Sequence, residues 1–124
     1  MRRPLIAGNW KMNLTHHEGA ALVSALTERL RGSATVHGAN NGGSDVEVVV
    51  CPPFTALAAV AAVLEASGWR LGLGAQDVHW EHRGPFTGEI AAPMLTALGC
   101  RYVIVGHSER RAHFGESDPV VSRK

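Results

Sequence analysis

Short apolar runs alternate with longer amphipathic stretches along these 124 residues. The apolar runs cover residues 5–7, 46–51, 71–75 and 101–105, and their lengths suit short buried strands. Each of the first three is followed by a stretch with helical periodicity. We therefore expect an α/β fold of parallel βαβ units, with right-handed connections and the helices on one outer face. The nearly continuous apolar character of the runs predicts strands that are covered on both faces.

Capping residues and helical periodicity define the helices between these runs. Thr15 and Glu18 have the spacing of a capping box, which predicts a first helix that ends at Gly32. The second helix is expected to end at Gly68 and the third at Gly99. The positions predicted to face the core are Leu22, Val23, Leu26 and Leu30 in the first helix, Leu57, Val60, Ala61 and Leu64 in the second, and Ile90, Met94, Leu95 and Leu98 in the third.

The polar segment after the last strand is the first candidate for chemistry. Gly106-His107-Ser108-Glu109-Arg110-Arg111 follows the apolar run Tyr102–Val105, and Ser108 suits a helix N-cap. A strand that ends here delivers His107 to the start of a helix, where the positive end of the helix dipole disfavours the imidazolium. A neutral imidazole can donate an N–H to a substrate oxygen. The alternative is a loop histidine that only hydrogen-bonds its neighbours.

A second polar cluster follows the first strand. Asn9 and Lys11 are two residues apart, which on an extended chain places them on the same side, with Trp10 on the other. An amide beside an ammonium suits an anionic substrate that also carries a carbonyl, whereas a lysine alone would be a solvated charge. Both clusters lie at carboxyl ends of predicted parallel strands, where α/β proteins bind ligands, and this favours a site.

Five motifs in order, including these two, resemble the amino-terminal half of the triosephosphate isomerase family. They are Gly8–Asn13, Ala75–Val78, Gly84–Ile90, Gly106–Arg111 and Phe114–Asp118, and the likeness runs from about Pro4 to Lys124. The resemblance implies a TIM-type (β/α)8 barrel, which needs about 200–250 residues, so about four of its eight units would be present. We expect residues 1–124 to form a single partial barrel domain, truncated in a helix that starts near Asp118 with Pro119 at its first position.

The resemblance also implies an activity. The family interconverts dihydroxyacetone phosphate and D-glyceraldehyde 3-phosphate through an enediolate, an aldose–ketose isomerisation of glycolysis and gluconeogenesis. His107 would be the electrophile, Asn9 and Lys11 would bind the substrate and take part in catalysis, and Glu109 would support Lys11. The alternative for Glu109 is a structural carboxylate in the first helical turn. The family's general base is a glutamate on a later strand, so we expect residues 1–124 alone to be inactive.

Residues 76–88 form a long loop without periodicity, and loops of this length inside a compact domain are usually functional. By the resemblance it is the dimer loop, to which we assign Phe86, Thr87 and Glu89. It would reach into the pocket of a second copy, with Thr87 near the substrate-binding residues there. The alternative is a mobile surface loop.

The composition is that of an ordinary globular domain, with 45% hydrophobic residues, 19% charged residues and a formal net charge of +1. No basic block stands out, so we expect no nucleic-acid partner. No apolar run approaches the ~20 residues of a membrane span and no signal peptide is recognised, so we expect no membrane partner and a cytoplasmic location. Cys51 and Cys100 lie beside apolar runs without a CxxC pattern, and we expect buried free thiols.

The seven histidines raise the question of a metal site. His79 and His82 have plausible ligand spacing, but no cluster of further ligands accompanies them, so we expect no metal. The resemblance implies no cofactor. We assign no chemistry to His16 and His17, or to Gly38–Ser44, which we expect to be an exposed insertion.

Two other functions compete with the isomerase. One is a non-catalytic half-barrel that acts by association through its exposed first and fourth strands. The other is a different phosphate-binding barrel enzyme that shares only the architecture. The paired clusters at Asn9/Lys11 and His107/Glu109 weigh against the second of these. We therefore expect a small phosphorylated triose as the substrate.

Overall fold

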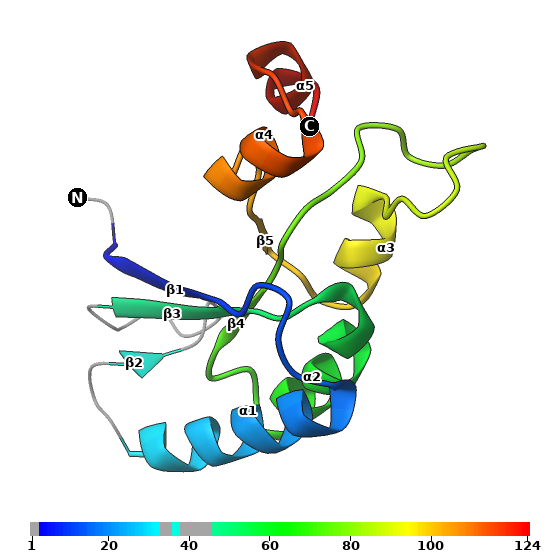
Figure 1. Ribbon diagram of the computed structural model, residues 1–124. Helices are drawn as coiled ribbons and strands as arrows, with labels where there is room; N and C mark the ends of the chain where they lie inside the picture. The colour runs from blue at the N-terminus through cyan, green and yellow to red at the C-terminus, as the bar shows by residue number, and fades with distance from the viewer. Residues whose placement is uncertain (1–2, 33–35, 38–45) are drawn as a thin grey trace.

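The computed structural model of this protein describes residues 3–32, 36–37 and 46–124. The insertion expected at 38–44 lies outside these residues. Strands and helices alternate along most of the described chain (Figure 1). In chain order the elements are β1 (Leu5–Asn9), α1 (His16–Leu30), β2 (Val36–His37), β3 (Val46–Cys51), α2 (Phe54–Ala66), β4 (Gly72–Ala75), α3 (Ala92–Ala97), β5 (Tyr102–Val103), α4 (Ser108–Phe114) and α5 (Asp118–Arg123).

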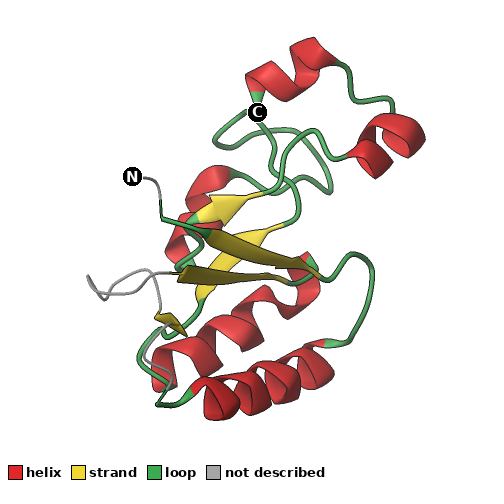
Figure 2. Cartoon of the chain, turned by 90° about the vertical axis from the view of Figure 1, so that its left-hand side faces the viewer, coloured by secondary structure: helices red, strands yellow, loops and turns green. Residues whose placement is uncertain are grey.

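All strand pairs are parallel, in the order β1-β3-β4-β5, and β2 also pairs with β3. Helices α1 and α2 lie side by side along one face of this sheet, while α4 and α5 stand beyond the carboxyl end of β5 (Figures 1 and 2). The expected parallel α/β architecture is therefore confirmed. The short strand β2 was not predicted.

Helix α1 begins as the capping box predicts. The Thr15 hydroxyl accepts from the Glu18 backbone N–H at 3.4 Å, and the Glu18 carboxylate accepts from the Thr15 N–H at 2.8 Å. The predicted inward stripe is wrong at Leu22, which is 46% exposed, whereas Thr27 is buried. The reason is the packing of α1 on α2 through the face that holds Gly19, Val23 and Thr27, at a spacing of four residues.

The core lies between α2 and the sheet. All four predicted core positions of α2 are buried, and they pack with Leu71 and Leu73 of the strand region. In α3 only part of the prediction holds: Leu95 is buried, but Met94 is 53% exposed and Ile90 precedes the helix. The α3 stripe is wrong at Met94 because this helix is only six residues long and turns one narrow face to the core.

The outer strands differ from the prediction of strands covered on both faces. Leu5 and Ile6 of β1 are 49% and 60% exposed, and Val103 of β5 is 40% exposed. Both strands are at the edges of the described sheet, so each has only one strand neighbour there. Strand β5 is also shorter than the predicted run of 101–105. The inner strands β3 and β4 are buried as expected.

Two glycines in β4 allow the neighbouring strands to pack closely. A Cβ at Gly72 would lie 2.9 Å from Val49 Cγ2, and a Cβ at Gly74 would lie 2.7 Å from Cys51 Sγ. The Tyr102 side chain lies within 3.5 Å of both positions. The absence of side chains in β4 therefore makes room for valine, cysteine and tyrosine from the strands on either side.

We expect Gly74→Ala to destabilise the fold by about 1–3 kcal/mol, because the added methyl overlaps packed neighbours. Gly8→Ala in β1 is the matched control, since its nearest contact would be Val49 O at an ordinary 3.8 Å. Urea unfolding of both variants measures the difference. Equal midpoints for the two would contradict the close packing at β4.

Candidate active site

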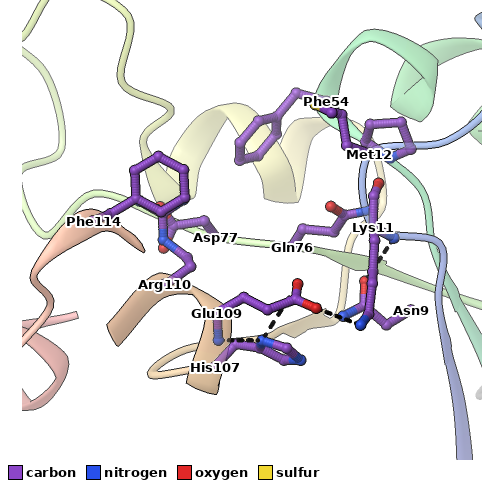
Figure 3. A pocket seen from close by; sticks show the side chains of 11 residues that line it. Asn9, Lys11, Met12, Phe54, Gln76, Asp77, His107, Glu109, Arg110 and Phe114 are labelled. Atoms are coloured by element: carbon purple, nitrogen blue, oxygen red, sulfur yellow. Dashed lines mark hydrogen bonds and ion pairs between the residues drawn. The ribbon is translucent and has the colours of Figure 1, made fainter. Parts of the chain in front are cut away.

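A pocket of about 290 Å³ opens where β1, β4 and β5 end, and we call it the strand-end pocket. All four side chains predicted to carry the chemistry line it, namely Asn9, Lys11, His107 and Glu109 (Figure 3). The structure thus brings together two clusters that are far apart in the sequence. The apolar residues that line it are Met12, Pro53, Phe54 and Phe114.

Lys11 has a left-handed backbone conformation, with φ of 56°. This conformation is unfavourable for a residue with a side chain, so the surrounding structure must hold it. The Asn9 Oδ1 accepts from the Lys11 N–H at 3.0 Å, and Gln76 Nε2 donates to the Lys11 carbonyl at 2.8 Å and to the Cys51 carbonyl at 2.9 Å. Asn9 therefore has its Nδ2 as the group that can donate to a ligand.

Sequence reasoning did not select Gln76, although this residue lies in one of the five motifs. Its amide joins the ends of β1 and β3 through the two carbonyls, and it lines the strand-end pocket. The available signal was a polar side chain directly after a buried strand, the same signal that identified Asn9 and His107.

His107 is itself the N-cap of α4, and the expectation that Ser108 takes this role is wrong. The His107 Nδ1 accepts from the Glu109 backbone N–H at 3.1 Å, and Ser108 is the first helical residue. The ring can cap the helix because Nδ1 is three bonds from Cα, as the Oδ1 of an asparagine cap would be. With Nδ1 as an acceptor, the proton of a neutral ring is on Nε2. The ring is 28% exposed and lines the pocket.

Lys11 and Glu109 form an ion pair across the pocket, with Lys11 Nζ donating to Glu109 Oε1. The hydrogen bond from Lys11 holds the pKa of Glu109 below its ordinary value. Both side chains are about half exposed, so the pair orients Lys11 more than it stabilises the fold. The support of Lys11 by Glu109 during catalysis stays a prediction.

A sequence-family model described as triosephosphate isomerase matches residues 4–124. The chain belongs to the triosephosphate isomerase family. Curated triosephosphate isomerases from Chloroflexus aurantiacus and Moorella thermoacetica are 56% and 52% identical to it over all 124 residues. The solved triosephosphate isomerase of Bartonella henselae superposes with a TM-score of 0.78 at 37% identity.

The chain spans 45% of the length of each of these two curated relatives. The superposition with the Bartonella henselae structure covers 99% of this chain and 46% of that one. The described strands therefore correspond to part of a triosephosphate isomerase barrel, which confirms the half-barrel inferred from the five motifs. A different barrel enzyme that shares only architecture is excluded by these identities.

A cluster of four charges adjoins the strand-end pocket, which Asp77 and Arg110 also line, and we call it the four-charge cluster: Asp77, Arg110, Glu116 and Lys124. Arg110 contacts Asp77 at 3.1 Å and Glu116 at 2.7 Å, and Lys124 Nζ donates to Asp77 at 2.7 Å and also to Glu116. The side chains of Asp77, Glu116 and Lys124 are at most 9% exposed. The cluster joins the end of β4 to α4 and α5, and sequence reasoning did not find it.

The hydrogen bonds in this cluster decide its protonation. Burial alone would raise the pKa of Glu116, but hydrogen bonds from Lys124 and Arg110 outweigh it and hold this pKa below its ordinary value. Burial would likewise lower the pKa of Lys124, but the hydrogen bonds to Asp77 and Glu116 raise it instead. Glu116 and Lys124 are therefore both charged near neutral pH.

The residues assigned to the dimer loop lie outside the strand-end pocket of the same chain. Residues 81–89 are exposed, and the loop projects from the body of the molecule near α3 (Figure 1). Phe86 is 38% exposed. Phe86, Thr87 and Glu89 therefore take no part in the strand-end pocket of their own chain.

Cys51 and Cys100 are free and buried, as expected, and burial raises the pKa of each thiol to about 11. Both are therefore protonated and unreactive near neutral pH.

Among the described residues no group of three or more His, Cys, Asp and Glu side chains could hold a metal. No helix in this same part of the chain has the length and apolar character needed to cross a bilayer.

Proposed function

We propose that this chain supplies the substrate-binding and electrophilic half of a triosephosphate isomerase, which acts on a small phosphorylated triose. The observation that carries the proposal is the convergence of Asn9, Lys11 and His107 on one pocket, with the proton of a neutral His107 on Nε2. A proton leaves a carbon beside a carbonyl in this reaction, so negative charge develops on the carbonyl oxygen. The His107 Nε2–H stabilises that charge.

Lys11 and Asn9 complete this electrostatic site. The Lys11 ammonium attracts the phosphorylated substrate and, together with the Asn9 amide, faces the developing oxyanion. Its left-handed backbone fixes where the side chain leaves the end of β1. Glu109 keeps the ammonium at the mouth of the pocket until substrate arrives. These groups bind and polarise the substrate, but none of them removes its proton.

The general base is expected to come from outside these 124 residues. Two carboxylates line the strand-end pocket, Asp77 and Glu109, and each is held by a cation. The chain alone is therefore expected to be inactive. A non-catalytic half-barrel that acts only by association, the alternative raised from the sequence, is not favoured, because the matched curated relatives are triosephosphate isomerases.

Two further proposals concern the setting of the enzyme. We propose a homodimer in which the 76–88 loop of one copy enters the strand-end pocket of the other, supported by the exposed Phe86 and by the apolar residues that line the pocket. We also propose a cytoplasmic location, supported by two free cysteines, which persist in reducing compartments.

A chimeric barrel tests the function directly. Residues 1–124 replace the matched part of the Moorella thermoacetica relative, which supplies the remaining strands. A coupled assay should detect isomerisation of glyceraldehyde 3-phosphate by the chimera and none by residues 1–124 alone. An inactive but folded chimera would contradict the proposal, and so would turnover by the isolated chain.

We expect Lys11→Met to lower kcat/KM of the chimera by about 10²-fold, because it keeps the bulk and removes the charge that faces the substrate anion. Arg29→Met, at an exposed position of α1, removes a charge far from the pocket and serves as the control. Steady-state kinetics decides the outcome. Unchanged kinetics would reduce Lys11 to a solvated surface charge.

A further inference from the structure

Four planar side chains contact one another in sequence between the projecting loop and α5, and we call them the stacked series: Phe86, His79, Trp80 and Arg123. The Phe86 and His79 ring centroids are 4.4 Å apart, and those of His79 and Trp80 are 4.3 Å apart. The Arg123 guanidinium lies 4.1 Å from the centroid of the Trp80 ring. Aromatic and cation–π contacts at these separations are attractive. The series therefore ties the apolar residue of the loop to a helix outside it.

Backbone contacts close the base of the loop at the same place. His79 donates its backbone N–H to the Ile90 carbonyl at 2.8 Å, and His79 and Ala91 form a parallel bridge. Near the tip, the Glu89 N–H donates to the Phe86 carbonyl at 3.0 Å. The His79 Nδ1 also lies 3.8 Å from Glu89 Oε2, and the Phe86 N–H donates to the Gly84 carbonyl at 2.9 Å. Residues 81–89 are exposed, and the stacked series adds to these local contacts a link from the loop to α5.

Arg123 is a firm anchor for this series because its neighbour is buried. Lys124 belongs to the four-charge cluster and contacts both Asp77 and Glu116. The end of α5 is thus tied to the end of β4, and Arg123 projects from this tied segment over Trp80. The contact between Arg123 and Trp80 thus stabilises the loop from α5, which lies outside it.

Each copy of the chain carries both halves of a self-complementary contact. The loop presents Phe86, which is 38% exposed. The strand-end pocket presents Met12, Phe54 and Phe114, which are 95%, 37% and 67% exposed. An exposed loop that docks into such a pocket loses conformational freedom, and a loop already held in its docking shape loses less. Because every copy carries both the loop and the pocket, the partner that the loop fits is a second copy of this chain.

We propose that Trp80 and Arg123 determine how tightly two copies associate, by holding the 76–88 loop in its docking shape. This inference rests on the proposed homodimer and adds to it two residues that do not line the strand-end pocket. It predicts that a substitution on α5 weakens association through the loop.

Sedimentation velocity of the chimeric barrel tests the proposal. Arg123→Gln removes the cation over Trp80 and should raise the dimer dissociation constant by about tenfold. Arg29→Gln, an exposed arginine of α1, is the matched control and should leave the constant unchanged. Arg123→Lys keeps the charge without the planar group, so its constant should fall between the two. Equal constants for Arg123→Gln and Arg29→Gln would overturn the proposal.

Limited trypsin digestion reads the shape of the loop without any assay of activity. Arg83 lies at the exposed tip, and cleavage there should be several-fold faster in Arg123→Gln and in Trp80→Leu than in the unsubstituted chimera. Cleavage is compared at a protein concentration where all three are dimeric. Unchanged cleavage in both variants would contradict the proposal that Trp80 and Arg123 hold the loop in its docking shape, whether or not the enzyme is active. An unsubstituted chimera that stays monomeric would overturn the homodimer and this inference together, while the isomerase assay judges the activity separately.

Discussion

Replacing His107 with Asn is expected to lower kcat of the chimeric barrel by about 10²–10³-fold, the usual loss when one oxyanion donor is removed. Asparagine is a good N-cap residue, so its side chain can accept from the Glu109 N–H as the His107 Nδ1 does at 3.1 Å. The variant lacks the Nε2–H that we propose as the donor to the substrate oxygen. Helix α4 should stay capped while turnover is lost, and steady-state kinetics with thermal unfolding separates the two effects.

His107→Phe is the companion variant. It keeps a planar ring but removes both nitrogens, so it should show the same loss of kcat together with a loss of about 1 kcal/mol in stability from the missing cap. If His107→Asn kept full turnover, the Nε2–H would have no part in the reaction. The ring would then be only a helix cap, which is the alternative raised from the sequence.

Lys124→Met is expected to lower the free energy of unfolding by about 3–5 kcal/mol, because it removes the buried cation that pairs with the buried carboxylates of Asp77 and Glu116. Asp77 and Glu116 would then share Arg110 alone. Arg31→Met is the matched control, since it breaks an ion pair with Glu28 in which both side chains are more than half exposed. That loss should be at most about 1 kcal/mol. Urea unfolding of both variants in the chimera would show whether burial makes this difference.

The same cluster predicts how stability depends on pH. The folded pKa of Glu116 is below its ordinary value, so its contribution is complete above about pH 4 and is lost as the pH falls further. The folded pKa of Lys124 is raised, so its contribution is complete below about pH 10 and is lost as the pH rises further. In Lys124→Met the acid-side loss should become smaller, because Glu116 loses a partner. An unchanged acid-side profile would mean that Lys124 does not set the pKa of Glu116.

Much of the architecture was predictable from local patterns. The capping box at Thr15, the four core positions of α2 and the alternation of strands with helices all depend on residues close together in the sequence. Two polar clusters at strand ends located Asn9, Lys11 and His107, because parallel strands place their carboxyl ends together. The five ordered motifs also identified the family, because each is a short stretch that can be recognised from residues close together in the sequence.

The tertiary structure decided which side of each element is buried and which distant charges meet. Leu22 and Met94 fit a helical stripe but are exposed, because the neighbour on which a helix packs selects its buried face. Asp77 and Lys124 are 47 residues apart, and Trp80 meets Arg123 only because α5 lies beside the loop. Hydrophobic periodicity and helix capping depend on residues close together in the sequence. These contacts depend instead on how segments that are far apart in the sequence pack together. No local pattern contains that information.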